Sequence, residues 1–104
     1  IAQGLIICLS SLMKTLALTP YLVRDGITFN CVAPVGIAIL GTGFDEEKAR
    51  YPKGFSENID RNYPLGRMGS TDQVASVIAF LCSNLASFAN GANVVLDGGQ
   101  SRSF

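Results

Sequence analysis

Two stretches near the end of the chain decide its fold. They are Pro64-Leu-Gly-Arg-Met-Gly-Ser-Thr-Asp-Gln-Val-Ala-Ser-Val-Ile-Ala-Phe-Leu-Cys-Ser83 and Gly91-Ala-Asn-Val-Val-Leu-Asp-Gly-Gly99. The first predicts a turn and a capped helix, because Ser70 and Gln73 have the spacing of a capping box. The second predicts a short buried strand that ends in a glycine turn. Together they are typical of the closing unit of an open α/β sheet.

The predicted helix after Ser70 has a favourable first turn and one apolar face. Asp72 places a negative charge near the positive end of the helix dipole. Four apolar side chains recur at helical spacing and should face the sheet: Val74, Val77, Ile78 and Leu81. The strand that follows is expected at Asn93–Leu96, where Asp97-Gly-Gly99 stops it.

An earlier helix and strand are expected upstream. Residues 2–18 predict a helix that is buried on more than one side, ended by Thr19-Pro20 because the residue before proline avoids the α region. Asp25-Gly26 predicts a turn, and residues 27–32 predict a strand whose pairing Ala33-Pro34 ends. The apolar face of the first helix combines these side chains: Leu5, Leu9, Leu12, Met13 and Leu16.

A long connection separates the two halves of the pattern. Residues 35–63 are first glycine-rich, then charged, then aromatic and polar, which predicts an excursion with one or two short helices. A connection this long in a compact domain usually has a function. We expect it to resemble a lid over a substrate.

The order of elements is therefore helix, strand, lid loop, helix, strand. Two strands joined by a helical crossover are expected to be parallel. Both strands are apolar enough to be buried on two faces, so the sheet should continue beyond them. We expect the strand at residues 27–32 to lack its inner neighbour. Residues 1–104 then form the C-terminal part of a single doubly wound α/β domain.

The composition restricts the partners of the chain. Its 104 residues carry zero net charge and only 15% charged residues, against 48% hydrophobic ones, so no field recruits nucleic acid. The low charge predicts surface covered by more chain or by a second subunit, as in a homo-oligomer. Lys14 interrupts the N-terminal apolar run well short of the roughly 20 residues that cross a bilayer, so no membrane contact is expected.

Cysteine and histidine content limit the chemistry. Cys8, Cys31 and Cys82 each lie in an apolar run and form no paired motif, which predicts reduced core residues in a cytoplasmic protein. Histidine is absent from the sequence, which removes the commonest general base and the commonest metal ligand. We predict no metal site.

The chain resembles the C-terminal portion of the short-chain dehydrogenase/reductases. The similarity covers nearly the whole chain in the order and spacing of that family. The segments that carry it are Leu12-Met-Lys-Thr-Leu-Ala-Leu18, Gly26-Ile-Thr-Phe-Asn-Cys-Val-Ala-Pro34, Pro64-Leu-Gly-Arg-Met-Gly69, Val74-Ala-Ser-Val-Ile-Ala-Phe-Leu81 and Gly91-Ala-Asn-Val-Val-Leu-Asp-Gly-Gly99.

This resemblance implies a Rossmann-type fold that binds NAD or NADP, and hydride transfer between an alcohol and a carbonyl. In the family a Ser, a Tyr and a Lys carry the chemistry, and the Lys follows the Tyr by four residues. In register, the Tyr position falls on Ala2 and the Lys position on Ile6, and neither side chain can move a proton. We therefore assign no catalytic residue. We predict that this chain alone neither binds the dinucleotide nor catalyses hydride transfer.

The resemblance also implies a nicotinamide-side loop after the first strand. Pro34 and Ile37 match the family pattern, Gly36 is displaced by one position, and Ile39 replaces a threonine. Pro34, Gly36 and Ile37 are the expected cofactor-binding residues, with Ile37 offering backbone groups to the carboxamide. Thr42 is a loose substitute for the missing hydroxyl.

Other interpretations of the connecting segment stay open. Gly36-Ile-Ala-Ile-Leu-Gly41-Thr-Gly43 is either a second phosphate turn or a flexible hinge at the base of the lid. Asp45-Glu46-Glu47 is expected to be a solvated helical turn. Arg61 and Arg67 either contact an anionic substrate or, for Arg67, bond turn carbonyls. Four aromatic side chains either line a substrate pocket or pin the loop to the core: Phe44, Tyr51, Phe55 and Tyr63.

Two functional hypotheses follow. The chain is the C-terminal part of an NAD(P)-dependent oxidoreductase acting on a small alcohol or ketone, and the N-terminal half is missing here. Alternatively, it is a catalytically inactive remnant that serves as an interaction or oligomerisation module. Ala2 and Ile6 favour the second hypothesis, whereas a start at Ile1 favours the first.

Overall fold

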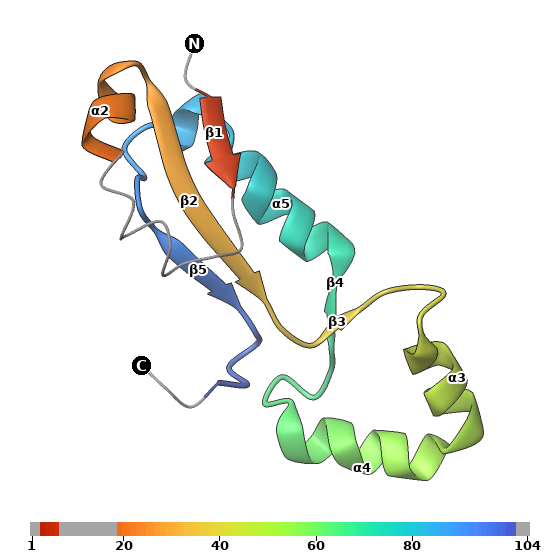
Figure 1. The fold of residues 1–104 in the computed structure, drawn as a ribbon. Helices are drawn as coiled ribbons and strands as arrows, with labels where there is room; N and C mark the ends of the chain where they lie inside the picture. The colour runs from red at the N-terminus through yellow and green to blue at the C-terminus, as the bar shows by residue number, and fades with distance from the viewer. Residues whose placement is uncertain (1–2, 7–18, 102–104) are drawn as a thin grey trace. The chain divides into compact units, whose positions relative to one another are not determined.

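The computed structural model describes residues 3–6 and 19–101, which divide into two compact units. Of the described residues, the first unit comprises residues 3–6, 19–33 and 75–95, and the second comprises residues 34–74 and 96–101. The first unit carries a parallel sheet, and the second carries a helical hairpin with a small two-stranded ladder (Figure 1).

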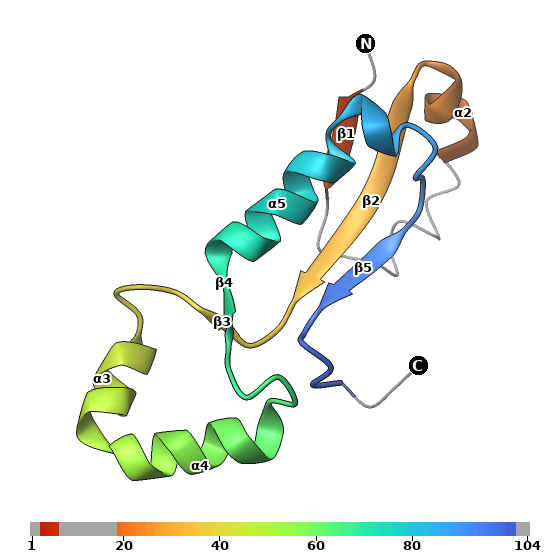
Figure 2. The same cartoon turned by 180° about the vertical axis from the view of Figure 1, so that it is seen from behind.

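A three-stranded sheet in the order β1-β2-β5 organises the first unit. Strand β1 (Gln3–Ile6) pairs in parallel with β2 (Ile27–Pro34), and Gln3 lies opposite Ile27. On its other side, β2 runs alongside β5 (Asn93–Leu96), and Figure 2 shows the two arrows pointing the same way. The strand at the centre is therefore β2, which has neighbours on both edges.

The start of the chain corrects two sequence-based predictions. Residues Gln3–Ile6 form a strand where a helix over residues 2–18 was expected, and residues 7–18 lie outside the described part. As a result β2 does not lack an inner neighbour, because β1 occupies that edge. The physical reason is that a short apolar run fits a buried strand and a buried helix equally well, so its periodicity does not separate them.

The segment before β2 holds one further correction and one confirmation. Helix α2 (Thr19–Arg24) begins at Thr19 where the sequence predicted a helix end. Proline is tolerated there because the first turn of a helix needs no hydrogen bond from its N–H groups. The turn at Asp25-Gly26 is confirmed: the N–H groups of Asp25 and Gly26 donate to the carbonyls of Leu22 and Val23, each at 3.0 Å.

Strand β2 supplies most of the buried core of the first unit. Asn30, Cys31 and Val32 are 1%, 3% and 1% exposed, so three consecutive residues are buried. Consecutive burial means that both faces of β2 are covered, as predicted for a parallel sheet. The same prediction is wrong for β5, whose residues alternate between exposed and half-buried. The strand runs on to Pro34, two residues beyond the expected boundary.

The side chain of Asn30 joins β2 to the loop that precedes β5. Its Nδ2 donates to the carbonyl of Ala89 at 2.9 Å, and its Oδ1 accepts from the N–H of Ala92 at 3.1 Å. Oδ1 of Asn90 in turn accepts from the N–H of Phe29 at 3.0 Å. These amide side chains fix the start of β5 against the central strand.

The expected excursion over residues 35–63 is present and contains two helices. Helix α3 (Gly43–Arg50) and helix α4 (Pro52–Asn62) form a hairpin, in which the N–H of Tyr51 donates to the carbonyl of Glu47 at 2.8 Å. Before them, β3 (Ile37–Ala38) pairs in parallel with β4 (Gly69–Ser70), so the segments before and after the hairpin meet. No sequence pattern predicted this ladder, which is only two residues long on each side.

The capping box predicted at Ser70 is confirmed. The N–H of Ser70 donates to Oε1 of Gln73 at 3.0 Å, and the N–H of Gln73 donates to Oγ of Ser70 at 3.3 Å. Helix α5 (Thr71–Leu81) follows, and a short 3-10 turn (Asn84–Ala86) leads toward β5 at its predicted bounds. Along the predicted apolar face Leu81 is buried, whereas three members are only half-buried: Val74, Val77 and Ile78.

The cysteines divide between core and surface. Cys31 is buried as expected, Cys82 is exposed at the end of α5 and so is not a core residue, and Cys8 lies outside the described residues. An apolar run at a helix end predicts burial only when other chain covers it. Within the described ranges no helix has both the length and the apolar character needed to cross a bilayer.

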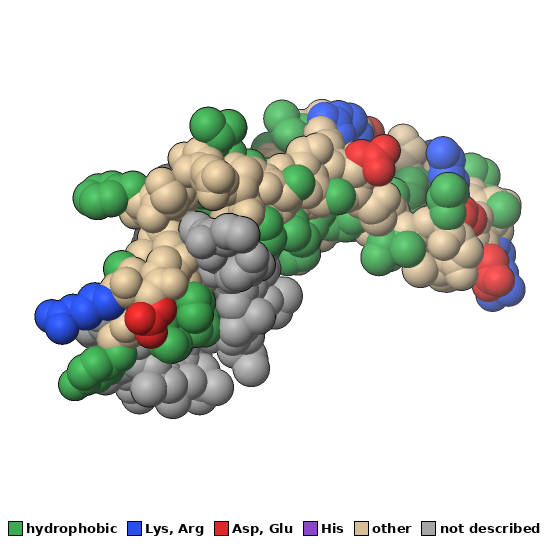
Figure 3. Space-filling model, turned by 90° about the horizontal axis from the view of Figure 1, so that it is seen from above, with side chains coloured by type: hydrophobic (Ala, Val, Ile, Leu, Met, Phe, Trp, Pro, Cys, Tyr) green, Lys and Arg blue, Asp and Glu red, His purple; other side chains and the backbone are tan. Residues whose placement is uncertain are grey.

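Large apolar side chains are exposed in both units. Figure 3 shows hydrophobic groups on the surface among the polar ones. The most exposed are Tyr21, Leu40, Tyr51, Leu65, Leu85 and Phe88. This surface agrees with the low charge of the sequence, which predicts that other chain covers part of it.

Candidate functional site

A cavity of about 170 Å³ in the second unit begins where β2 and β5 end. Val35 follows β2 directly, Leu96 is the last residue of β5, and the N–H of Val35 donates to the carbonyl of Leu96 at 3.0 Å. Ligands of open parallel sheets bind at the carboxyl ends of the strands. The residues that line the cavity are Val35, Gly36, Ile37, Tyr63, Leu65, Arg67, Gly69, Gln73, Val74, Leu96, Asp97 and Gly98.

Gly36 is required by the geometry of this cavity. Its φ of +67° lies in the left-handed region, and a Cβ there would come within 2.5 Å of Cε1 of Tyr63. Gly69 faces Ile37 across the β3–β4 ladder, and a Cβ on Gly69 would meet Cδ1 of Ile37 at 2.7 Å. The two glycines therefore let the backbones approach and leave the cavity open.

Of the two polar groups in the peptide that joins Gly36 to Ile37, the carbonyl is hydrogen-bonded within the ladder and the N–H is available to a ligand. The carbonyl of Gly36 accepts from the N–H of Gly69 at 3.0 Å. The N–H of Ile37 belongs to the same trans peptide as that carbonyl, so it points away from β4. This leaves one backbone donor of the predicted loop on the edge opposite the ladder.

Asp97 fixes the turn at the other side of the cavity. Its carboxylate accepts from the N–H of Gly99 at 2.9 Å and from the N–H of Ser101 at 2.8 Å, and the Ser101 hydroxyl donates to it as well. The Ser101 hydroxyl, followed by the backbone N–H groups of Ser101 and Gly99, holds the pKa of this exposed carboxyl below its ordinary value. Asp97 is thus a structural acceptor of the turn and remains ionised at neutral pH.

The structure brings two of the three expected cofactor residues together. Gly36 and Ile37 both line the cavity, whereas Pro34 is the exposed last residue of β2 just before it. The position that matches the family lysine, Ile6, lies at the end of β1, and Ala2 lies outside the described residues. Among the described residues no cluster of side chains could hold a metal ion.

A second cavity, of about 320 Å³, lies against the helical hairpin of the same unit. Ile37 lines the first cavity and Ala38 lines the second, as expected for consecutive residues of a strand, and Arg67 borders both. The residues that line the second cavity are Ala38, Phe44, Asp45, Lys48, Phe55, Ile59, Gly66, Arg67 and Met68.

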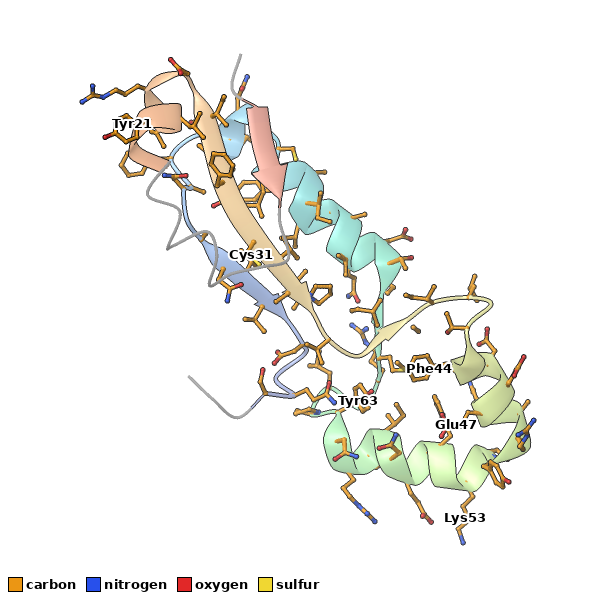
Figure 4. All side chains as sticks on the ribbon, viewed as in Figure 1. Tyr21, Cys31, Phe44, Glu47, Lys53 and Tyr63 are labelled. Atoms are coloured by element: carbon orange, nitrogen blue, oxygen red, sulfur yellow. The ribbon has the colours of Figure 1, made fainter. Side chains whose placement is uncertain are left out.

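The four aromatic side chains of the connecting segment separate into groups. Phe44 and Phe55 line the second cavity, and Tyr63 lines the first. In Figure 4 the ring of Phe44 extends from the first turn of α3 toward the β3–β4 ladder. Tyr51 is exposed and lines neither of these two cavities.

Most charged side chains of the connecting segment are exposed to solvent or bond a turn carbonyl, which was the simpler of the two interpretations. The run at residues 45–50 is exposed, and Arg61 is exposed on α4. Arg67 acts as a turn residue: its Nη1 donates to the carbonyl of Met68 at 3.1 Å and reaches Oε1 of Gln73 at 3.4 Å.

The glycine-rich segment favours a hinge over a phosphate turn. The N–H of Gly41 points to Oδ2 of Asp45 at 3.4 Å, which puts a carboxylate at the place a phosphate would need. The hydroxyl of Thr42 donates to the carbonyl of Ile39 at 2.7 Å and so does not cap α3. No atom lies within 4 Å of a Cβ built on Gly41, which leaves that turn free of packing.

Sequence reasoning overlooked Asn30 and Asp97. Asn30 stands in a strand of β-branched and aromatic residues, where asparagine is disfavoured, and that exception was the available signal. Asp97 carried a signal too, because an Asp before two glycines is a common turn that accepts from N–H groups two residues on.

Most of the chain matches a family profile and the sequences of known proteins. The family profile described as enoyl-(acyl carrier protein) reductase matches residues 7–101. A tropinone reductase homolog of Arabidopsis thaliana is 40% identical over 75 residues, covering 72% of this chain and 26% of the relative. The uncharacterized oxidoreductase YohF of Escherichia coli is 35% identical over 91 residues, covering 88% and 33%. The chain thus spans a third or less of the length of these relatives.

Solved structures share the fold. YwfH, an NADPH-dependent reductase involved in bacilysin biosynthesis, is 31% identical with a TM-score of 0.74, covering 92% of this chain and 37% of that one. L-sorbose reductase from Gluconobacter frateurii, complexed with NADPH and L-sorbose, has a TM-score of 0.78 at 22% identity, covering 99% and 49%, a likeness of fold. With its parallel α/β sheet and a family match over residues 7–101, the chain belongs to the short-chain dehydrogenase/reductase family.

Proposed function

We propose that the chain acts as the C-terminal part of an NAD(P)-dependent oxidoreductase that interconverts an alcohol and a carbonyl by hydride transfer. The observation that carries this proposal is the cavity at the carboxyl ends of β2 and β5, the place where the sheets of such folds bind their ligands. The relatives and solved structures that support it are oxidoreductases.

The cavity fits one end of a dinucleotide. Its volume of about 170 Å³ is well below the roughly 300–1,000 Å³ of a pocket for a whole ligand. Gly36 would let the nicotinamide ring approach the backbone, and the N–H of Ile37 would donate to its carboxamide. Pro34 would position this turn by ending β2. When bound, the cofactor supplies or accepts the hydride.

The connecting segment would act as the substrate lid. Residues 35–63 leave β2 and form the α3–α4 hairpin, and the chain that follows them pairs at β4 with β3. The second cavity lies under that hairpin and would take a small alcohol or ketone. The buried Cys31 carries a free thiol, which supports a reducing compartment such as the cytoplasm.

Paired glycine substitutions test the cofactor site in the whole protein. Gly36→Ala and Gly41→Ala both force alanine into a positive φ, but only the first puts a methyl group against Tyr63. We expect Gly36→Ala to weaken binding of NADH or NADPH about tenfold or more, measured by calorimetry, and Gly41→Ala to leave it unchanged. Equal effects of the two variants would remove the turn after β2 from the cofactor site.

One observation favours the second hypothesis, an inactive remnant that serves as an interaction or oligomerisation module. Ile6, at the position of the family lysine, is part of β1 and offers no proton. Such a module would use exposed apolar side chains, among them Leu85 and Phe88. Turnover by the whole protein would exclude this alternative.

A further inference from the structure

The second cavity has an apolar floor built mainly by α4. Phe55 and Ile59 lie one helical turn apart and line the cavity, and both are half-buried, whereas every other residue of α4 is exposed. Met68 and Phe44 extend this floor from the returning turn and from α3. The cavity can therefore bury an apolar group of moderate size away from water.

The rim of the same cavity carries more positive than negative charge. Lys48 and Arg67 border it with Asp45, two positive groups against one negative group. Oδ2 of Asp45 is directed at the N–H of Gly41, at 3.4 Å, and so already has a weak partner. The balance at the rim is positive, although the whole chain carries zero net charge.

Lys48 is the positive group best placed to meet a ligand. In the part of the chain that the structure describes, its ammonium forms no ion pair or hydrogen bond. Arg67, in contrast, uses Nη1 on the carbonyl of Met68 and on Gln73, and it stands where the second cavity meets the first. The two cations thus come from different segments: Lys48 from α3, and Arg67 from the returning turn, where it also lines the first cavity.

We propose that the second cavity selects a substrate with an apolar body and one anionic group, which the ammonium of Lys48 binds. The apolar body lies on Phe55, Ile59 and Met68, and the reacting end lies toward Arg67. A charge-assisted hydrogen bond from Lys48 to the anion adds to the burial of the apolar body. The role as a substrate site rests on the proposed function, whereas the preference for an anionic amphiphile does not.

Binding of octanoate and octan-1-ol to the whole protein tests this preference without turnover. Lys48→Glu reverses the charge at the rim, and Lys53→Glu makes the same change on an exposed residue of α4 that lines neither cavity (Figure 4). NMR shifts of the Ile59 and Met68 methyl groups report occupancy of the cavity. Circular dichroism checks that both variants keep their helices.

We expect octanoate to bind the unmodified protein more tightly than octan-1-ol. Lys48→Glu should weaken octanoate binding about tenfold and leave octan-1-ol unchanged, and Lys53→Glu should change neither. Equal affinity for the two probes, no binding of either, or equal effects of the two variants would overturn the proposal. A protein that binds octanoate as expected but shows no turnover would contradict the proposed function alone.

Discussion

At the scale of single residues, a few side chains hold the backbone where the site needs it. Asn30 is buried in β2 and binds both a carbonyl and an N–H of the loop before β5. Gly36 keeps the first cavity open because no side chain fits beside Tyr63. The family pattern pointed to Gly36, but Asn30 could not be predicted, because its partners lie about 60 residues away in the sequence.

Asn30→Ala should destabilise the protein by several kcal/mol. The change leaves the N–H of Ala92 and the carbonyl of Ala89 without this partner in a part-buried place, at about 1–3 kcal/mol for each unpaired group. Chemical denaturation measures the free energy of unfolding. Asn93→Ala, at an exposed position of β5, is the matched control and should cost much less. Equal costs would show that the Asn30 amide does not hold the loop.

Ser101→Ala should raise the pKa of the Asp97 carboxyl toward its ordinary value of 3.8, because the Ser101 hydroxyl is the main cause of its lowering. A lowered pKa contributes stability that is present above the unfolded value and is lost as pH falls through the folded one. The turn at residues 97–101 should therefore loosen only in strong acid. NMR titration of the carboxyl group and of the Gly99 amide follows both. An unchanged midpoint in the variant would contradict this assignment.

At the scale of elements, the turn at Asp25-Gly26, the strand after it and most of the second half of the chain were predictable, whereas the first elements of the chain were not. Helix α5 has a start signal, an apolar face and a length that agree with one another, so local preference and tertiary structure coincide. The strand at Gln3–Ile6 lacked such signals. Its partner β2 follows it by more than 20 residues, and only that pairing decides between strand and helix.

Substitutions in α5 should separate the contribution of capping from that of packing. Ser70→Ala should cost about 1 kcal/mol, because it removes the acceptor for the N–H of Gln73. Leu81→Ala should cost about 2–5 kcal/mol, since Leu81 is only 4% exposed. Phe80→Ala, next to it but about half exposed, is the control and should cost less. If chemical denaturation shows that Leu81→Ala lowers the free energy of unfolding by less than Ser70→Ala or Phe80→Ala does, the burial of this face is contradicted.

At the scale of the whole molecule, the fold class could be predicted because the order of helices and strands can be recognised from short sequence patterns. The site could be predicted only in part. Gly36 and Ile37 follow from the family pattern, but the cavities depend on how the excursion returns to pair β3 with β4. That pairing joins residues about 30 positions apart through bonds of the backbone, which side-chain patterns do not reveal.

The 104-residue chain by itself should self-associate. Exposed apolar side chains such as Leu40, Leu85 and Phe88, together with a charged content of 15%, leave much surface that water solvates poorly. Light scattering at tens of micromolar, a concentration at which such surfaces associate, measures the mass. A clean monomer would show that this surface needs no partner.

The central claim is that the chain completes the nicotinamide end of an alcohol–carbonyl oxidoreductase. The most direct measurement follows the absorbance of NADH and NADPH in the presence of a panel of ketones and aldehydes, with the whole protein and with the 104-residue chain separately. We expect the whole protein to oxidise one of the two cofactors only when a carbonyl compound is present, and the chain alone to show no turnover. No carbonyl-dependent oxidation by the whole protein, or turnover by the chain alone, would contradict the account.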